Sequence, residues 1–200
     1  MAAVAAAAPL APLIFLDVDG VLVPARCLRG SFDEADESLL HDAARQAPPL
    51  GRANLAALAR LARAAPGGAA RIILSSSWRL PIAADLRAAL ERALGGAGIA
   101  LAGATGAGGG GRGAEVAGWV LAHAPGAPLV VLDDDHAKSF ELAGLKPFLV
   151  AVDAERGLTE ADADAALRIL EGQASGACAV WRPASVLAAR ALEGRGGTAA

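Results

Sequence analysis

The chain has 200 residues, of which 54% are hydrophobic and 20% charged, so it can bury a substantial core and is not a disordered protein. Its net charge of −3 and its aromatic content of 4% exclude a strongly basic, base-stacking surface, so nothing indicates non-specific nucleic-acid binding. The two cysteines are too few for a disulfide framework and favour a reducing compartment.

Residues 1–12 are alanine-rich, interrupted by prolines and free of basic residues, and we predict a flexible lead there. This pattern does not fit a signal peptide or a membrane span. A cytoplasmic location is therefore predicted, although the sequence leaves an organelle address open. We predict a single catalytic domain over residues 13–171. Residues 172–200 are rich in alanine and glycine without a clear period, and they are predicted to form a low-complexity tail that docks or frays.

The elements predicted in chain order alternate between strands and helices. Short apolar runs that end at polar turns predict buried strands at 13–16, 71–74, 99–101, 129–132 and 148–152. Leucine spacing and glycine or proline stop signals predict helices at 50–65, 81–94, 114–123 and 160–171. Residues 24–49 are polar and are predicted to be a loop or small flap. This alternation is typical of an α/β, Rossmann-like three-layer sandwich with a mainly parallel sheet.

Acidic and hydroxyl side chains follow three of these predicted strands. In strand order they are Asp17 and Asp19, Ser75 and Ser76, and Asp133 and Asp134. Ligands of such sheets bind at the carboxyl ends of the strands, so we expect these side chains to share one crevice. Clustered carboxylates are unfavourable unless a cation neutralises them, and oxygen ligands suit Mg²⁺. The sequence therefore predicts a magnesium site at this edge of the sheet.

These motifs, in this order, resemble the haloacid-dehalogenase (HAD) superfamily of phosphohydrolases. The motifs are Asp17-Val-Asp-Gly20 after a hydrophobic strand, Ser75 at the end of a second strand, and Asp133-Asp134 closing a third. The chain is most similar to the small-capped branch found in predicted nucleic-acid repair proteins. The segments that carry this likeness are Ser76-Ser-Trp-Arg79, Arg112-Gly-Ala-Glu-Val116 and Gly157-Leu-Thr159. The resemblance implies a HAD-like domain with at most a small flap and no large cap domain.

The resemblance also implies a mechanism of phosphomonoester hydrolysis. Asp17 would attack phosphorus and form an aspartyl-phosphate, while Asp19 would protonate the leaving group and then activate water. Mg²⁺ would be held by Asp17, Asp19 through its backbone carbonyl, Asp133 and Asp134. The phosphate would be held by Ser75 or Ser76 and by Arg112. The implied substrate is a phosphorylated small molecule, a nucleotide, a nucleic-acid end or another exposed phosphate; the oligomeric state is not indicated.

One departure from the family pattern concerns the lysine that normally pairs with the nucleophile and the phosphate. The chain has two lysines, Lys138 and Lys146, and neither lies between the second-strand motif at Ser75 and the acidic pair Asp133-Asp134. Arg112 stands in the matching region, and a guanidinium can bind phosphate with two parallel hydrogen bonds. The departure supports an alternative, a catalytically silent module that binds phosphate or metal, although Asp19 would have no use there. A phosphotransferase is a third hypothesis.

Other residues have simpler interpretations. Trp78 is predicted to pack in the core or under the flap, and Arg79 either contacts substrate or makes a surface ion pair. His136 lacks the spacing of a metal ligand and is interpreted as structural or exposed. The tract Gly106–Gly111 fits a dinucleotide-binding fingerprint, but glycine-rich runs match it by chance, so a flexible loop is the preferred interpretation.

Overall fold

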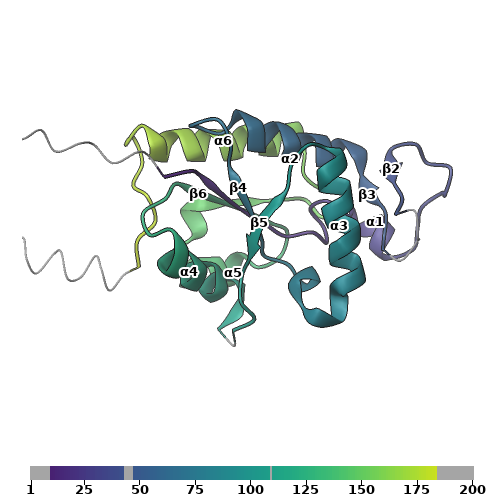
Figure 1. Ribbon diagram of the computed structural model, residues 1–200, viewed down its shortest axis with the longest axis horizontal. Helices are drawn as coiled ribbons and strands as arrows, with labels where there is room; N and C mark the ends of the chain where they lie inside the picture. Colours follow the sequence, from purple (N-terminus) through teal and green to yellow (C-terminus); the bar gives the residue numbers. More distant parts are fainter. Residues whose placement is uncertain (1–9, 43–46, 109, 184–200) are drawn as a thin grey trace, which may run out of the picture.

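Five strands form a parallel sheet at the centre of the computed structural model, which describes residues 10–42, 47–108 and 110–183 (Figure 1). They are β1 (Leu13–Leu16), β4 (Arg71–Leu74), β5 (Leu101–Ala104), β6 (Leu129–Asp133) and β7 (Leu149–Ala151). Their spatial order is β5-β4-β1-β6-β7, and every neighbouring pair is parallel. The fold is therefore α/β with the parallel central sheet that the sequence predicts.

Strand β1 is apolar throughout because both of its faces are buried. Ile14 and Leu16 pack into the core on one side of the sheet, whereas Leu13 and Phe15 pack into the core on the other side. Successive side chains of a strand point to opposite faces, so a strand covered on both sides needs an unbroken apolar run. Burying each such side chain contributes about 1.5–3 kcal/mol, which makes β1 a firm base for the residues that follow it.

Helices cover both faces of the sheet and complete three layers (Figure 1). Helices α2 (Arg52–Ala64), α3 (Ala84–Gly96) and α6 (Glu160–Ala174) bury their apolar residues on one face. Helices α4 (Gly111–His123) and α5 (Ala137–Leu142) do so on the other. Short 3₁₀ helices lie at η1 (Ser77–Arg79), η2 (Pro81–Ala83) and η3 (Lys146–Phe148). This arrangement confirms the Rossmann-like sandwich.

The segment between β1 and α2 forms a small flap. It contains the one-turn helix α1 (Ala25–Leu28) and the antiparallel ribbon of β2 (Leu39–Leu40) and β3 (Leu50–Gly51). Residues 43–46 lie outside the described part of the chain. Within the described ranges no large cap domain covers the sheet, as the sequence predicts.

Some boundaries differ from those predicted. Strand β5 lies at Leu101–Ala104 instead of 99–101, because its small residues give little apolar signal. Helix α5 was not predicted, since six residues are too few to show a helical period. Helix α4 begins at Gly111, earlier than the predicted start. All of these differences fall where the local pattern is short or rich in glycine.

Part of the predicted tail packs against the domain. Helix α6 continues past Glu171 to Ala174, and the amide of Gln173 bonds both backbone groups of Leu129 at 3.1 and 2.7 Å. Trp181 is buried, and its indole donates to the carbonyl of Ala143 at 3.1 Å. Residues 184–200 of the tail and residues 1–9 of the lead lie outside the described part.

None of the helices in the described ranges combines the length and the apolar composition that crossing a bilayer requires.

Gly113→Ala is expected to lower the free energy of unfolding by about 2–3 kcal/mol, as overpacking a close contact does. Gly113 lies where α4 crosses α5, and a Cβ there would be 2.2 Å from the backbone oxygen of Ser139. Gly118 is on the same helix, and a Cβ at that position would have no atom of the described residues within 4 Å. Gly118→Ala is the matched control and should gain about 0.5–1 kcal/mol from helix propensity. Urea unfolding measures both variants; equal changes would contradict the packing argument.

Candidate active site

The topology of the sheet brings two acidic strand ends together. β1 is the first strand of this sheet in the chain and lies at its centre. The next two strands in the chain, β4 and β5, lie on one side of β1, and the last two, β6 and β7, lie on the other. The direction of winding reverses between β1 and β6, and a crevice opens beyond the carboxyl ends at such a point. Asp17 directly follows β1, and Asp133 is the last residue of β6. The amide of Asp17 donates to the carbonyl of Leu132 at 3.0 Å, which fixes the two acidic residues side by side.

Asp17 is a buried carboxylate, with 5% of its surface exposed. Its Oδ1 accepts a hydrogen bond from the Val18 amide at 2.8 Å and lies 3.9 Å from Nη1 of Arg112. Burial raises the pKa of Asp17 to about 6; the charge of Arg112 opposes this shift, and that of Asp133 adds to it. Arg112 therefore compensates only part of the cost of burying this charge.

The two carboxylate oxygens of Asp133 differ in their surroundings: one accepts hydrogen bonds, and the other has no donor among the described residues. Oδ1 accepts from the amides of Asp135 and His136 at 3.1 and 2.9 Å, and Nδ1 of His136 lies 3.2 Å away. Oδ2 is buried and has no hydrogen-bond partner among the described residues. A buried oxygen without a donor is unfavourable unless something else binds it. A cation satisfies that requirement.

Three side chains could together hold a metal ion, because one potential ligand atom of each lies within 4.8 Å of those of the other two; they belong to Asp17, Asp133 and His136. Two carboxylates suit a hard cation such as Mg²⁺, and an imidazole nitrogen also suits transition metals. His136 was not expected here, because nothing in its spacing marks it as a ligand. Its place three residues after Asp133, on the turn into α5, is the local signal that could have indicated it.

Asp134 lies in the same pocket but outside this group of ligand atoms. Its carboxylate rests on Gly20, where a Cβ would be 2.2 Å from Oδ2, and Gly20 has a φ of +75°. The Asp-Gly turn after β1 therefore needs glycine both for its conformation and for the space that Asp134 occupies. Burial raises the pKa of Asp134. Its role as a metal ligand stays a prediction.

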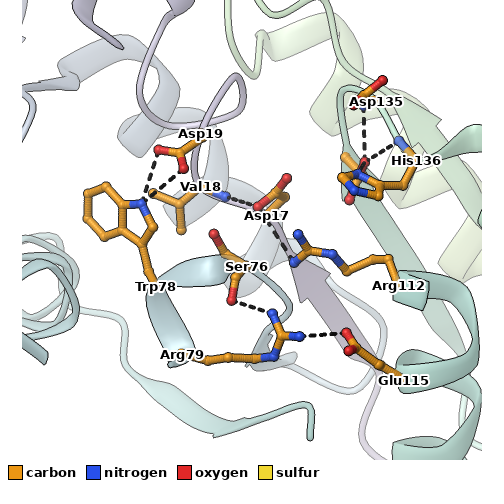
Figure 2. A network of polar contacts seen from close by, with 11 residues as sticks. Asp17, Val18, Asp19, Ser76, Trp78, Arg79, Arg112, Glu115, Asp135 and His136 are labelled. Carbon is orange, nitrogen blue, oxygen red and sulfur yellow. Dashed lines mark hydrogen bonds and ion pairs between the residues drawn. The ribbon is translucent and has the colours of Figure 1, made fainter. Parts of the chain in front are cut away.

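Asp19 is held by Trp78 on the flap side of the site. The indole Nε1 of Trp78 donates to both oxygens of Asp19, at 3.0 and 3.2 Å (Figure 2). Burial raises the pKa of Asp19, against the opposing effects of this hydrogen bond and of Arg112. Trp78 is buried as predicted, but its contact with Asp19 was not anticipated, because it joins residues far apart in the sequence.

The predicted phosphate-binding residues approach Asp17 from two directions. Arg112 extends from the first turn of α4, and its Nη1 has no hydrogen-bond partner among the described residues. Ser75 and Ser76 follow β4, and both are buried. The Ser75 hydroxyl is likewise without a partner in the described part, and Figure 2 shows Ser76 beside Asp17. The structure thus brings these groups together, and their roles in phosphate binding stay predictions.

Arg79 does not make the surface ion pair that is one of its two predicted roles, and its contact with substrate stays a prediction. Its guanidinium forms a partly buried ion pair with Glu115 of α4, at 2.6 Å between Nη2 and Oε2, and both side chains are 9% exposed. The partner was not predictable, since the two residues are 36 positions apart and no local pattern links them.

An open pocket of about 270 Å³ lies over the strand ends. Its lining includes Asp17, Asp19, Arg112, Asp134 and His136. Carboxylates, an arginine and an imidazole therefore face a space that is open to solvent and large enough for a phosphoryl group.

In the absence of metal, Asp17→Asn is expected to raise the free energy of unfolding by about 2 kcal/mol at about pH 8, and to leave it unchanged near pH 4. Burial raises the pKa of Asp17 from 3.8 to about 6, so the folded state binds this proton more tightly than the unfolded state. Ionising Asp17 therefore costs stability as the pH rises through this window.

Urea unfolding in EDTA at several pH values measures this difference. Asp85→Asn, at an exposed carboxylate in the first turn of α3, controls for the change of charge and should stay within about 0.5 kcal/mol throughout. If Asp17→Asn were instead less stable than wild type at about pH 8, the prediction would be wrong, because the ionised carboxylate would then stabilise the folded protein without metal.

Comparison with known proteins identifies a family for this chain. A family model described as the HAD domain in Swiss Army Knife RNA repair proteins matches residues 13–163. A search of curated proteins found no significant match, and neither did a search of solved structures. The match covers most of the chain, including β1, β4, β6 and the acidic strand ends, and it confirms the resemblance that the motifs indicate. The chain belongs to the family of HAD domains found in Swiss Army Knife RNA repair proteins.

Proposed function

We propose that this protein is a Mg²⁺-dependent phosphomonoester hydrolase that forms an aspartyl-phosphate on Asp17. The observation that carries the proposal is the buried Oδ2 of Asp133, which has no hydrogen-bond partner in the described part of the chain and lies next to a buried Asp17 whose pKa is about 6. Both features are those of carboxylates built to bind a cation. Membership of a HAD family supports the same reaction class.

Two displacements at phosphorus make up the proposed reaction. In the first, a carboxylate oxygen of Asp17 bonds to phosphorus, the bond to the ester oxygen breaks, and Asp19 donates a proton to the departing alkoxide. In the second, Asp19 removes a proton from water, the water oxygen bonds to phosphorus, and the bond to Asp17 breaks. Inorganic phosphate leaves, and both carboxyl groups return to their starting states.

The environments of the two acids suit these different roles. Asp17 is fixed by the Val18 amide and faces Arg112, which favours a charged nucleophile oriented towards the pocket. Burial raises the pKa of Asp19, which favours the protonated form that the first step requires. Burial raises the pKa of Asp17 as well, so the ionised nucleophile depends on the charge of Arg112 and on that of the cation that the site would bind. Trp78 holds the Asp19 carboxylate and limits its rotation.

Asp17 and Asp133 would hold Mg²⁺, with Asp134 and the backbone carbonyl of Asp19 as further predicted ligands. When bound, the cation supplies positive charge that screens the approach of an anionic phosphate to an anionic nucleophile. Arg112 binds the phosphoryl oxygens from the other side, in the role that lysine has in the family pattern, and the Ser75 and Ser76 hydroxyls add hydrogen bonds.

The substrate is proposed to carry an exposed phosphate, such as a nucleic-acid end or a nucleotide. Two observations support this class: the pocket over Asp17 is open, with a small flap beside it, and the family occurs in RNA repair proteins. Rates of phosphate release distinguish the members of this class when they are measured on oligonucleotides phosphorylated at the 5′ or 3′ end and on phosphorylated metabolites.

Hydrolysis of p-nitrophenyl phosphate is expected to require Mg²⁺ and to fall at least about 100-fold in Asp133→Asn, which removes one charge from the cation site. The control is Asp153→Asn, at an exposed acid near the end of the neighbouring β7, which should retain wild-type turnover. Turnover that is indifferent to EDTA would overturn the metal-dependent mechanism.

A catalytically silent binding module is the second candidate, and the arginine in place of lysine is the observation that favours it. Tight Mg²⁺ binding without turnover of any phosphoester would support it. Transfer of the phosphoryl group to an added alcohol in place of water would identify a phosphotransferase.

A further inference from the structure

Helix α4, which carries Arg112, is fixed to the rest of the domain at its first turns. The Gly113 amide donates to Oγ of Ser139 at 2.8 Å, which ties α4 to α5. From the other direction, Arg79 pairs with Glu115 at 2.6 Å. Arg79 also donates from Nη1 to the carbonyl of Ser76 at 2.5 Å. One guanidinium thus links α4 to the segment that follows β4 (Figure 2).

This ion pair is not part of the lining of the pocket over Asp17. Neither Arg79 nor Glu115 is among the residues that surround the space over Asp17. An ion pair that is partly withdrawn from solvent carries a desolvation cost and is weak evidence of stabilisation. The rigid fork of arginine nevertheless fixes the relative positions of two acceptors when each of its Nη nitrogens has its own partner, as in Arg79. Here the acceptors belong to the two elements that present phosphate-binding groups.

We propose that the Arg79–Glu115 pair is a positioning pair that sets Arg112 and the Ser75–Ser76 segment at the distance a phosphoryl group requires. Glu115 is three residues after Arg112 on α4 and therefore lies on the same side of the helix. Ser76, whose carbonyl Arg79 holds, lies beside Asp17 opposite Arg112. The inference rests on the proposed function, because it assigns these groups to the phosphate subsite.

Binding of inorganic phosphate in the presence of Mg²⁺, measured by isothermal titration calorimetry, tests the proposal without turnover. Glu115→Gln keeps the shape of the side chain and is expected to weaken phosphate binding about tenfold, or about 1.4 kcal/mol. The control is Glu155→Gln, which removes one partner of the exposed Arg29–Glu155 pair and should leave phosphate binding unchanged.

A double-mutant cycle separates positioning from general loosening. The ammonium of lysine binds phosphate without a fixed fork geometry, so in an Arg112→Lys background Glu115→Gln should weaken binding less than about twofold. An equal tenfold loss in both backgrounds would overturn the proposal, since the pair would then act independently of Arg112. An unchanged affinity in the single variant would also overturn it.

A second variant covers the case in which Glu115→Gln does not fold because Arg79 is left unpaired. Arg79→Met/Glu115→Gln removes both charges and should fold, as circular dichroism would show, while binding phosphate about tenfold more weakly. Wild-type affinity in this folded variant would overturn the positioning role and leave the hydrolase proposal intact. A wild-type protein that neither binds nor releases phosphate would instead overturn the proposed function, and this inference with it.

Discussion

Asp17→Asn is expected to lower kcat/KM for phosphoester hydrolysis by at least about 10⁴-fold, as the loss of a nucleophile does in other enzymes. An amide oxygen is a poor nucleophile, and no other described carboxylate accepts a hydrogen bond from Val18 beside Arg112. Stopped assays with p-nitrophenyl phosphate and a phosphorylated oligonucleotide measure the loss.

The same substitution should stabilise the metal-free protein, because it removes a buried charge. A loss of activity combined with a gain in stability separates chemistry from misfolding, since an unfolded variant would lose both. Residual activity within about tenfold of wild type would mean that Asp17 is not the attacking group.

Asp19→Asn is expected to affect substrates according to their leaving groups. For a phosphorylated alkyl alcohol, whose alkoxide needs a proton in order to leave, kcat/KM should fall about 10²–10⁴-fold. For p-nitrophenyl phosphate the fall should be about tenfold or less, because nitrophenolate leaves without protonation. Steady-state kinetics with both substrates measures the difference.

Trp78→Phe is the matched control for this result, because it removes the hydrogen bond to Asp19 and leaves the carboxylate in place. It should show the same dependence on the leaving group, with smaller losses. Equal losses for both substrates in Asp19→Asn would show that Asp19 holds the site together and does not transfer a proton.

The parts of the site that follow strands were predictable from the sequence. An unbroken apolar run such as Leu13–Leu16 indicates a strand buried on both faces, and parallel strands deliver their carboxyl ends to one edge. The sequence therefore predicted that Asp17 and Asp133 lie at the same edge of the sheet, because each follows a recognisable strand of a parallel sheet. The structure adds the 3.0 Å hydrogen bond from Asp17 to Leu132 that fixes this pairing.

The contacts that orient these acids were not predictable. Trp78 reaches Asp19, and Arg79 reaches Glu115, across long separations in sequence. Only packing of the flap side and of α4 against the sheet brings them together. His136 was missed for a different reason, since its approach to Asp133 depends on the turn after β6. Periodicity locates elements, whereas these contacts depend on how elements pack.

Arg112 lies between these two cases. The family pattern indicated the region of the chain, but its distance of 3.9 Å from Asp17 depends on where α4 begins and how closely it packs. Gly113, with no room for a Cβ against Ser139, allows α4 to pack closely against α5. Its position therefore required the three-dimensional structure.

The most direct test of the account is to trap the phosphorylated protein. Asp19→Asn should form the aspartyl-phosphate from p-nitrophenyl phosphate and Mg²⁺ but hydrolyse it slowly, because no base activates water. After acid quenching, peptide mass spectrometry is expected to find one phosphoryl group on the peptide that contains Asp17, and none in Asp17→Asn/Asp19→Asn. A phosphoryl group on another residue, or hydrolysis without any phosphorylated protein, would contradict the account.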